Sequence, residues 1–255
     1  SGTSGAVTTQ VAVGDFECDG VDDLVIGEYE YSSSSTVVNN GAIFIFFGGS
    51  GLGSSTVSSY SMSSDADVVI YGSARSEELG HSVVLADASG DGCDDLIALS
   101  GNGLSSLYSG TGDSDIYTYI GDSSWKATSA YTLTNAADDT TTLEIDGYEN
   151  KVSSSASSFP YYYYMYKLGA LDGDADGSGS VDEEDSYLAI CSDYLDECEL
   201  MHVENVLTSS SDIESLSDFT VTSNHVHEGV LTSGDFDGDG NEDLAVGNSG
   251  DTATD

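Results

Sequence analysis

The sequence has very few basic residues: Lys and Arg total 4 against 46 Asp and Glu, so the 255-residue chain has a formal net charge of -42 at pH 7. A surface with so few cations cannot neutralise a phosphate backbone, which excludes nucleic-acid binding. No apolar run approaches the ~18 residues needed to cross a bilayer, so we expect no membrane insertion. Divalent cations, cationic partners or a high-salt medium are the natural complements of this charge.

Proline is nearly absent as well, with one copy at Pro160, so turns must depend on the 30 Gly and on Ser, Asn and Asp. High net charge with modest hydrophobicity is also typical of disordered chains. Here, however, the acids gather beside Gly in short segments flanked by β-branched runs, and 16 Tyr, 7 Phe and 1 Trp are too many aromatics for a solvated tail. The sequence therefore predicts a folded, all-β protein.

An acidic, glycine-containing loop of nine residues occurs three times, starting at Asp15, Asp87 and Asp235. Each copy has oxygen-bearing side chains at positions 1, 3, 5 and 9 and Gly at position 6, and each lies between two strand-like apolar runs. Alternate residues of a tightly curled loop point inward, and Ca2+ prefers about six to eight oxygen ligands. Recurrence at one register favours structural Ca2+ sites over solvated turns.

The predicted ligands include a residue at position 7, which contributes its backbone carbonyl. They are Asp15, Glu17, Asp19, Val21 and Asp23 in the first loop, Asp87, Ser89, Asp91, Cys93 and Asp95 in the second, and Asp235, Asp237, Asp239, Asn241 and Asp243 in the third.

A further acidic loop, residues 174–185, has the spacing of an EF-hand, with oxygen-bearing side chains at positions 1, 3, 5, 9 and 12 and Gly at position 6. Residues 186–191 are predicted to follow it as a short helix. The alternative is a degenerate nine-residue loop closed by Asp182, and both interpretations predict Ca2+ binding. The candidate ligands are Asp174, Asp176, Ser178, Ser180, Asp182 and Asp185, which brings the expected number of Ca2+ sites to about four.

The three nine-residue loops and their flanking strands resemble FG-GAP repeats, the blades of integrin-alpha-type β-propellers. Residues 41–50 are similar to the outgoing strand and closing glycines of the family, residues 79–84 to the stretch that opens each repeat, and residues 108–112 to another hairpin. The 174–185 loop resembles a dockerin-type half EF-hand. These resemblances imply a β-propeller-like array of Ca2+-stiffened blades with a small EF-hand-like insertion, in an extracellular adhesive protein without catalysis.

The resemblance also divides the chain into three parts. Residues 1–122 correspond to FG-GAP blades 1 and 2, residues 123–225 to divergent blades carrying the EF-hand-like loop, and residues 226–255 to a partial C-terminal blade. A blade needs about 40 to 50 residues, so the ring is expected to be short and its last blade to lack strands. An incomplete sheet has an edge that must be covered, which predicts head-to-tail self-association and an open filament unless the rotation closes.

Four cysteines, Cys18, Cys93, Cys191 and Cys198, allow three disulfide pairings. Cys191 and Cys198 are close enough in sequence for a local bridge, and adjacent blades would bring the loops that carry Cys18 and Cys93 together. Four buried thiols are the alternative. Because disulfides persist in oxidising compartments, we expect an extracellular protein, secreted or at the cell surface.

Three other features bear on function. The Tyr-rich run at residues 161–166 is predicted to be a strand covered on both faces, with an aromatic platform for sugars or a subunit contact as the alternative. His225 and His227 would share one strand face and can begin a transition-metal site, but surface histidines are the expectation. The chain has no nucleophile-elbow, zinc-protease or phosphate-loop motif, so we expect no enzyme.

The sequence therefore predicts a non-enzymatic, calcium-stabilised structural protein that assembles into a surface filament or appendage. The alternative is a monomeric calcium-dependent adhesion or carbohydrate-binding module. The expected partners are further copies of the chain, and glycans or other surface proteins.

Overall fold

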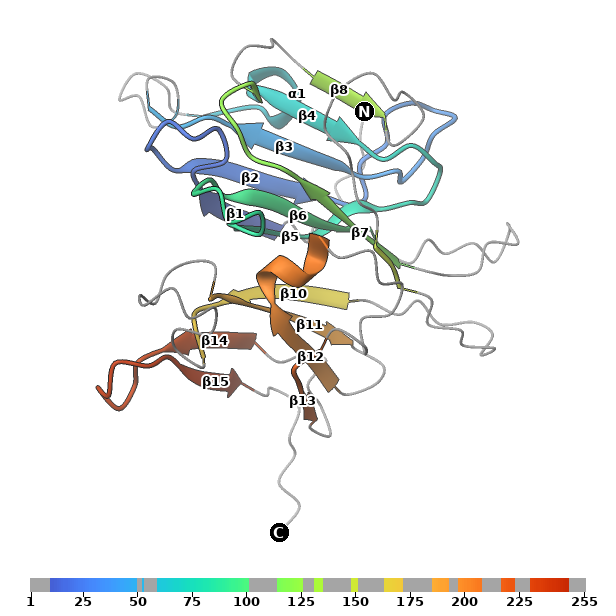
Figure 1. Ribbon diagram of the computed structural model, residues 1–255. Helices are drawn as coiled ribbons and strands as arrows, with labels where there is room; N and C mark the ends of the chain where they lie inside the picture. Colours follow the sequence, from blue (N-terminus) through green and yellow to red (C-terminus); the bar gives the residue numbers. More distant parts are fainter. Residues whose placement is uncertain are drawn as a thin grey trace, which may run out of the picture.

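The computed structural model describes residues 10–49, 52, 59–100, 114–125, 131–134, 148–150, 163–171, 185–192, 197–207, 217–222 and 230–247. Nearly all regular structure in these residues is β-strand, arranged in four sheets of which none closes on itself (Figure 1). The all-β prediction is confirmed. Among the described residues, no helix is both long enough and apolar enough to cross a membrane.

The first sheet is an antiparallel meander with one added parallel strand, in the order β1-β2-β3-β4-β8. A short helix, α1 (Met62–Asp65), lies between β3 and β4. Every residue of β3 is apolar and buried, because other parts of the chain cover both of its faces. The strands are β1 (Gln10–Gly14), β2 (Asp23–Glu28), β3 (Ala42–Phe46), β4 (Val68–Tyr71) and β8 (Tyr131–Thr134).

The other three sheets are antiparallel throughout. The second sheet contains β5 (Leu79–Ala86), β6 (Asp95–Ser100), β7 (Ser114–Tyr119) and β9 (Tyr148–Asn150). The third contains β10 (Tyr163–Leu168), β11 (Tyr187–Ser192), β12 (Glu197–His202) and β13 (Phe219–Thr222), with a 3-10 helix η2 (Val203–Leu207) after β12. The fourth contains β14 (Val230–Gly234) and β15 (Asp243–Gly247).

The sheets stack in chain order, and their first strands lie against one another: β5 contacts β1, β10 contacts β5, and β14 contacts β10 (Figure 1). Side chains alternate across a strand, so a middle sheet contributes to two cores. In β5, Val83 and Leu85 pack in the core shared with the first sheet, whereas Val84 and Ala86 pack in the core shared with the third. This stacking is the arrangement expected of successive blades, and the β-propeller-like array stays a prediction.

The strands predicted on both sides of the three nine-residue loops are confirmed, as β1 and β2, β5 and β6, and β14 and β15. The Tyr-rich run also forms the predicted strand over its described part, β10, with Met165 in the core toward the second sheet and Leu168 in the core toward the fourth. Residues 108–112, His225 and His227 lie outside the described residues. Two strands from the region predicted to be divergent, β8 and β9, join the first and second sheets.

The short helix predicted for residues 186–191 is wrong, because these residues form most of the central strand β11. Leu188 and Ile190 pack toward the second sheet, and Ala189 and Cys191 pack on the opposite face. A strand that is buried on both faces has no alternation of apolar and polar residues, so its sequence does not differ from that of a short buried helix.

The expectation of disulfides over buried thiols is confirmed, since all four cysteines are paired, and of the three possible pairings the structure has Cys18–Cys93 and Cys191–Cys198. Cys191 and Cys198 are directly opposite each other on β11 and β12. The Cys18–Cys93 bridge connects the acidic loop of the first sheet to that of the second.

Candidate metal centre

The three nine-residue loops share one plan, in which the position-9 carboxylate fastens the start of the loop to its end. One oxygen of this carboxylate accepts the backbone N–H groups of positions 2 and 3, at 2.8 to 3.3 Å, in all three loops. In the first two loops the other oxygen accepts an N–H from beyond the third strand of the same sheet. Gly48 donates to Asp23 at 2.8 Å, and Gly121 donates to Asp95 at 2.8 Å.

This clamp places two predicted metal ligands inside the protein. Asp23 is 1% exposed and Asp95 is 0% exposed. Burial raises the pKa of Asp23, and it raises the pKa of Asp95 to about 6, while the backbone N–H donors act in the opposite direction. Both oxygens of each carboxylate already accept hydrogen bonds, so a metal ion would use their remaining lone pairs.

The position-1 carboxylate lies inside the turn of the loop, and the backbone of the loop folds around it. It accepts N–H groups from positions 5 and 6 in every loop, at 2.7 to 3.1 Å. The Gly at position 6 is required there, since its φ is +85° in Gly20, +87° in Gly92 and +97° in Gly240. Position 4 is left-handed too, and Cys18, with φ of +60°, takes the place that Gly90 and Gly238 hold in the other loops.

The third loop brings its acids together. Carboxylate oxygens of Asp235, Asp237 and Asp239 all lie within 4.8 Å of one another, and the three residues are exposed. Within the described part of the chain, they form the only such group of three or more His, Cys, Asp or Glu residues. An all-oxygen donor set that includes three carboxylates fits Ca2+, and the position-7 carbonyl of Asn241 belongs to the same loop.

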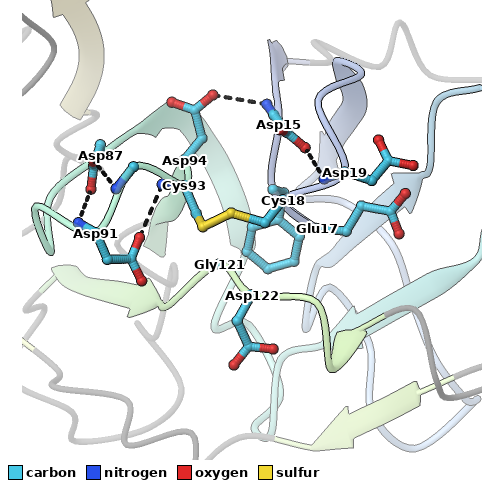
Figure 2. Close-up of a disulfide and its surroundings, with 12 residues drawn as sticks. Asp15, Glu17, Cys18, Asp19, Asp87, Asp91, Cys93, Asp94, Gly121 and Asp122 are labelled. Carbon is cyan, nitrogen blue, oxygen red and sulfur yellow. Dashed lines mark hydrogen bonds between the residues drawn. A yellow bond between two sulfur atoms is a disulfide. The ribbon is translucent and has the colours of Figure 1, made fainter.

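The first two loops differ from the third at position 3, and their acids do not form such a group among the described residues. Position 3 is Glu17 in the first loop, where the side chain is 1% exposed, and it is Ser89 in the second, where only a hydroxyl is offered. Figure 2 shows Glu17 and Asp19 on one side of the Cys18–Cys93 disulfide and Asp87 and Asp91 on the other. The two loops therefore present separate groups of acids on either side of one covalent link.

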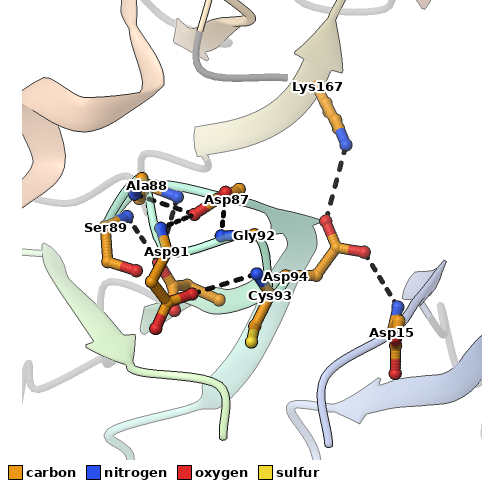
Figure 3. Close-up of polar contacts among 11 residues, drawn as sticks. Asp15, Asp87, Ala88, Ser89, Asp91, Gly92, Cys93, Asp94 and Lys167 are labelled. Atoms are coloured by element: carbon orange, nitrogen blue, oxygen red, sulfur yellow. Dashed lines mark hydrogen bonds and ion pairs between the residues drawn. The ribbon is translucent and has the colours of Figure 1, made fainter. Parts of the chain in front are cut away.

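The first two loops are also joined by two hydrogen bonds between Asp15 and Asp94. The Asp15 N–H donates to Asp94 Oδ2 at 2.8 Å, and the Asp94 N–H donates to the Asp15 carbonyl at 3.2 Å. The ammonium of Lys167, on β10, lies 3.7 Å from Asp94 Oδ1 (Figure 3). Asp94 thus connects the first three sheets. The prediction of metal ligands omitted position 8, although an acid recurs there as Asp22, Asp94 and Glu242.

Of the predicted 174–185 site, only Asp185 is among the described residues; Asp174, Asp176, Ser178, Ser180 and Asp182 lie outside them. Asp185 is 1% exposed and lies just before β11. The strand that follows is not the helix predicted with the EF-hand interpretation. The choice between an EF-hand-like loop and a nine-residue loop closed by Asp182 stays a prediction, since these residues lie outside the described ones.

No protein-family model and no curated protein sequence matches the chain. The FG-GAP and dockerin resemblances therefore stay predictions that rest on loop spacing and on the flanking segments.

Proposed function

We propose that this protein is a non-catalytic, extracellular structural protein, built of FG-GAP-type blades, whose acidic loops bind Ca2+ and whose copies associate head to tail. The observation that carries this proposal is the convergence of Asp235, Asp237 and Asp239 in a loop whose backbone plan is repeated twice more in the chain. The shared plan supports one role for all three loops.

The proposed role of Ca2+ is to offset repulsion between carboxylates that the backbone holds together. Two like charges about 4 Å apart repel by about 1 kcal/mol in water and by more near a protein surface. Asp235, Asp237 and Asp239 would hold the ion with the Asn241 carbonyl. When bound, the ion supplies positive charge and stiffens the connection between β14 and β15. The buried clamp carboxylates, Asp23 and Asp95, would keep the first two loops in register with their sheets.

The covalent links support an extracellular location. Two disulfides in a chain of this size are typical of oxidising compartments. One of them fastens two acidic loops together, which suits a protein that must keep its shape outside the cell. The stack of sheets also has two unlike ends, β1 and β14, and unlike ends are what head-to-tail addition of subunits requires.

Sedimentation velocity in millimolar Ca2+, before and after chelation, tests this proposal. We expect large species in Ca2+ that fall apart into less stable monomers when the ion is removed. A compact monomer in Ca2+ at both low and high salt would refute self-association. Sedimentation and thermal unfolding that do not respond to chelation would refute the role of Ca2+.

A second candidate function is a monomeric calcium-dependent adhesion or carbohydrate-binding module. The exposure of Asp235, Asp237 and Asp239 favours it, because an ion held there stays accessible to the oxygens of an outside ligand. Glycan binding by a monomer, lost on chelation and lost in Asp237→Asn, would support this function in place of the first.

A further inference from the structure

Two of the three junctions between neighbouring sheets share a contact at their acidic loops, and the third, between the second and third sheets, does not, because β5 ends at Ala86 instead of a glycine. The acid at position 8 of one loop lies against the glycine at the end of the first strand of the preceding sheet. Asp94 lies against Gly14, and Glu242 lies against Gly169, so closely that a Cβ atom on either glycine would collide with the carboxylate. At each of these junctions, one sheet therefore contributes the acid and the preceding sheet contributes the glycine that it contacts.

The strand faces follow a matching rule. Counted back from the loop, Val83 and Leu85 of β5 occupy the positions that Val11 and Val13 occupy in β1. Val83 and Leu85 pack on the preceding sheet. Leu231, at the first of these positions in β14, likewise packs in the core shared with the preceding sheet. This face of a first strand is therefore covered in the second and fourth sheets.

In the first sheet the same face is open. Val11 is 55% exposed and Val13 is 60% exposed, because Ala12 between them is the residue that packs toward the second sheet. Asp22, the position-8 acid of the first loop, is exposed too. The first sheet therefore exposes Val11, Val13 and Asp22, the equivalents of the residues with which the second sheet contacts the first.

The fourth sheet has the complementary features, which are a glycine at the end of its first strand and an exposed strand face. Gly234 ends β14, and a Cβ atom added there would meet only the Phe236 side chain of its own loop. The face of β14 that points away from the third sheet carries Thr232, which is exposed. Thr232 occupies the position of Val84 in β5, and Val84 packs toward the sheet that follows its own.

The open face is limited to the edge of the first sheet. Toward β3 and β4, its outer face is capped, since Phe44 and Phe46 pack with Met62 of α1 and with Leu52. Leu24 and Ile26 of β2 are half-buried against this group, so the exposed apolar residues of this face are Val11 and Val13 of β1. The fourth sheet has two described strands, β14 and β15, to place over β1 and β2.

We infer that a second copy of this chain covers β1: the β14–β15 sheet of one copy stacks on the β1–β2 edge of the next, and Asp22 of the second copy lies against Gly234 of the first. This inference rests on the head-to-tail association in the proposed function and names its interface. The two surfaces differ, so each added copy leaves one of each open, and a filament results unless the rotation closes a ring. The net charge of -42 makes this contact depend on cations.

Disulfide trapping tests the geometry. At the Gly14 junction, the Asp94 carboxyl carbon lies 2.9 Å from an ideal Gly14 Cβ. The Asp94 Cβ is one bond from that carbon, so the two Cβ atoms are no further apart than the roughly 3.5 to 4.5 Å that a disulfide allows. The double variant Asp22→Cys/Gly234→Cys should therefore give a ladder of covalent oligomers. Oxidation is carried out in Ca2+ at about 1 M salt, where the Debye length is about 3 Å.

Any result for the double variant other than a ladder of covalent oligomers would overturn the inference. A cross-linked monomer would show that the two ends meet within one copy, and a lack of cross-links would show that these residues do not meet. Asp22→Cys alone and Gly234→Cys alone should give no ladder, but a 1:1 mixture of the two should give a covalent dimer. Dimers of Asp22→Cys alone would indicate a symmetric contact instead.

A pair of matched charge variants provides a test without cross-linking. Val13→Asp should lose the large species in sedimentation, and Thr222→Asp, which adds the same charge at an exposed end of β13, should keep them. Both should keep the wild-type circular dichroism spectrum. If wild type assembles but Val13→Asp assembles equally well, the interface is wrong and the proposed function stands. If wild type stays monomeric in every condition, both fail.

Discussion

Glu78 makes the stability of the protein depend on pH near neutrality. It lies in the connection between β4 and β5, is 5% exposed, and donates its backbone N–H to the Asn39 carbonyl at 3.1 Å. Burial raises the pKa of its carboxyl from 4.5 to about 7, and the nearby negative charge of Glu30 acts in the same direction.

The sign of the effect follows from proton binding. Between pH 4.5 and about 7, the folded protein keeps a proton on Glu78 that the unfolded chain has released. The free energy of unfolding therefore falls as pH rises through this window and levels off above it. With about 1.4 kcal/mol for each unit of pKa, the loss amounts to about 3 kcal/mol.

Glu78→Gln should remove this loss, because the amide has the shape of the protonated acid and does not titrate. We measure the free energy of unfolding of both proteins with urea in Ca2+. Relative to wild type, the free energy of unfolding of the variant should increase by about 3 kcal/mol between pH 4.5 and pH 7. This corresponds to roughly 6 to 12 °C in melting temperature. Glu204→Gln, at an exposed position, is the matched control and should keep a constant difference from wild type. A Glu78→Gln curve parallel to that of wild type would refute the reasoning.

Three further predictions concern the junction between the first two sheets and the third loop. Cys18→Ala/Cys93→Ala should lower the free energy of unfolding by roughly 4 kcal/mol, since the bridge spans 75 residues, and a loss below about 1 kcal/mol in urea unfolding would contradict this. Gly14→Ala should cost roughly 1 to 3 kcal/mol in the same assay, because its Cβ would displace the Asp94 carboxylate. Asp237→Asn should remove one Ca2+ from the stoichiometry measured by calorimetry and leave the others, and an unchanged stoichiometry would place the ion elsewhere.

Local chemistry made the acidic loops and their flanking strands predictable. The Gly at position 6, the acids at alternate positions and the β-branched runs beside them act within about ten residues of one another, and the structure has the predicted strands at all three copies. The same reasoning failed for β11. Its residues are buried by two different neighbouring sheets, and a fully buried segment shows no periodicity in the sequence.

Sequence spacing alone left the disulfide pairing and the role of position 8 open. The sequence by itself determined that the chain is all-β, that it carries repeated acidic loops and that its net charge requires cations, because each of these depends on composition or on neighbours along the chain. Only the tertiary structure decided that Cys18 meets Cys93 and that Asp94 lies against Gly14 beside Lys167. These partners are separated by many tens of residues, and what brings them together is the stacking of one sheet face on the next.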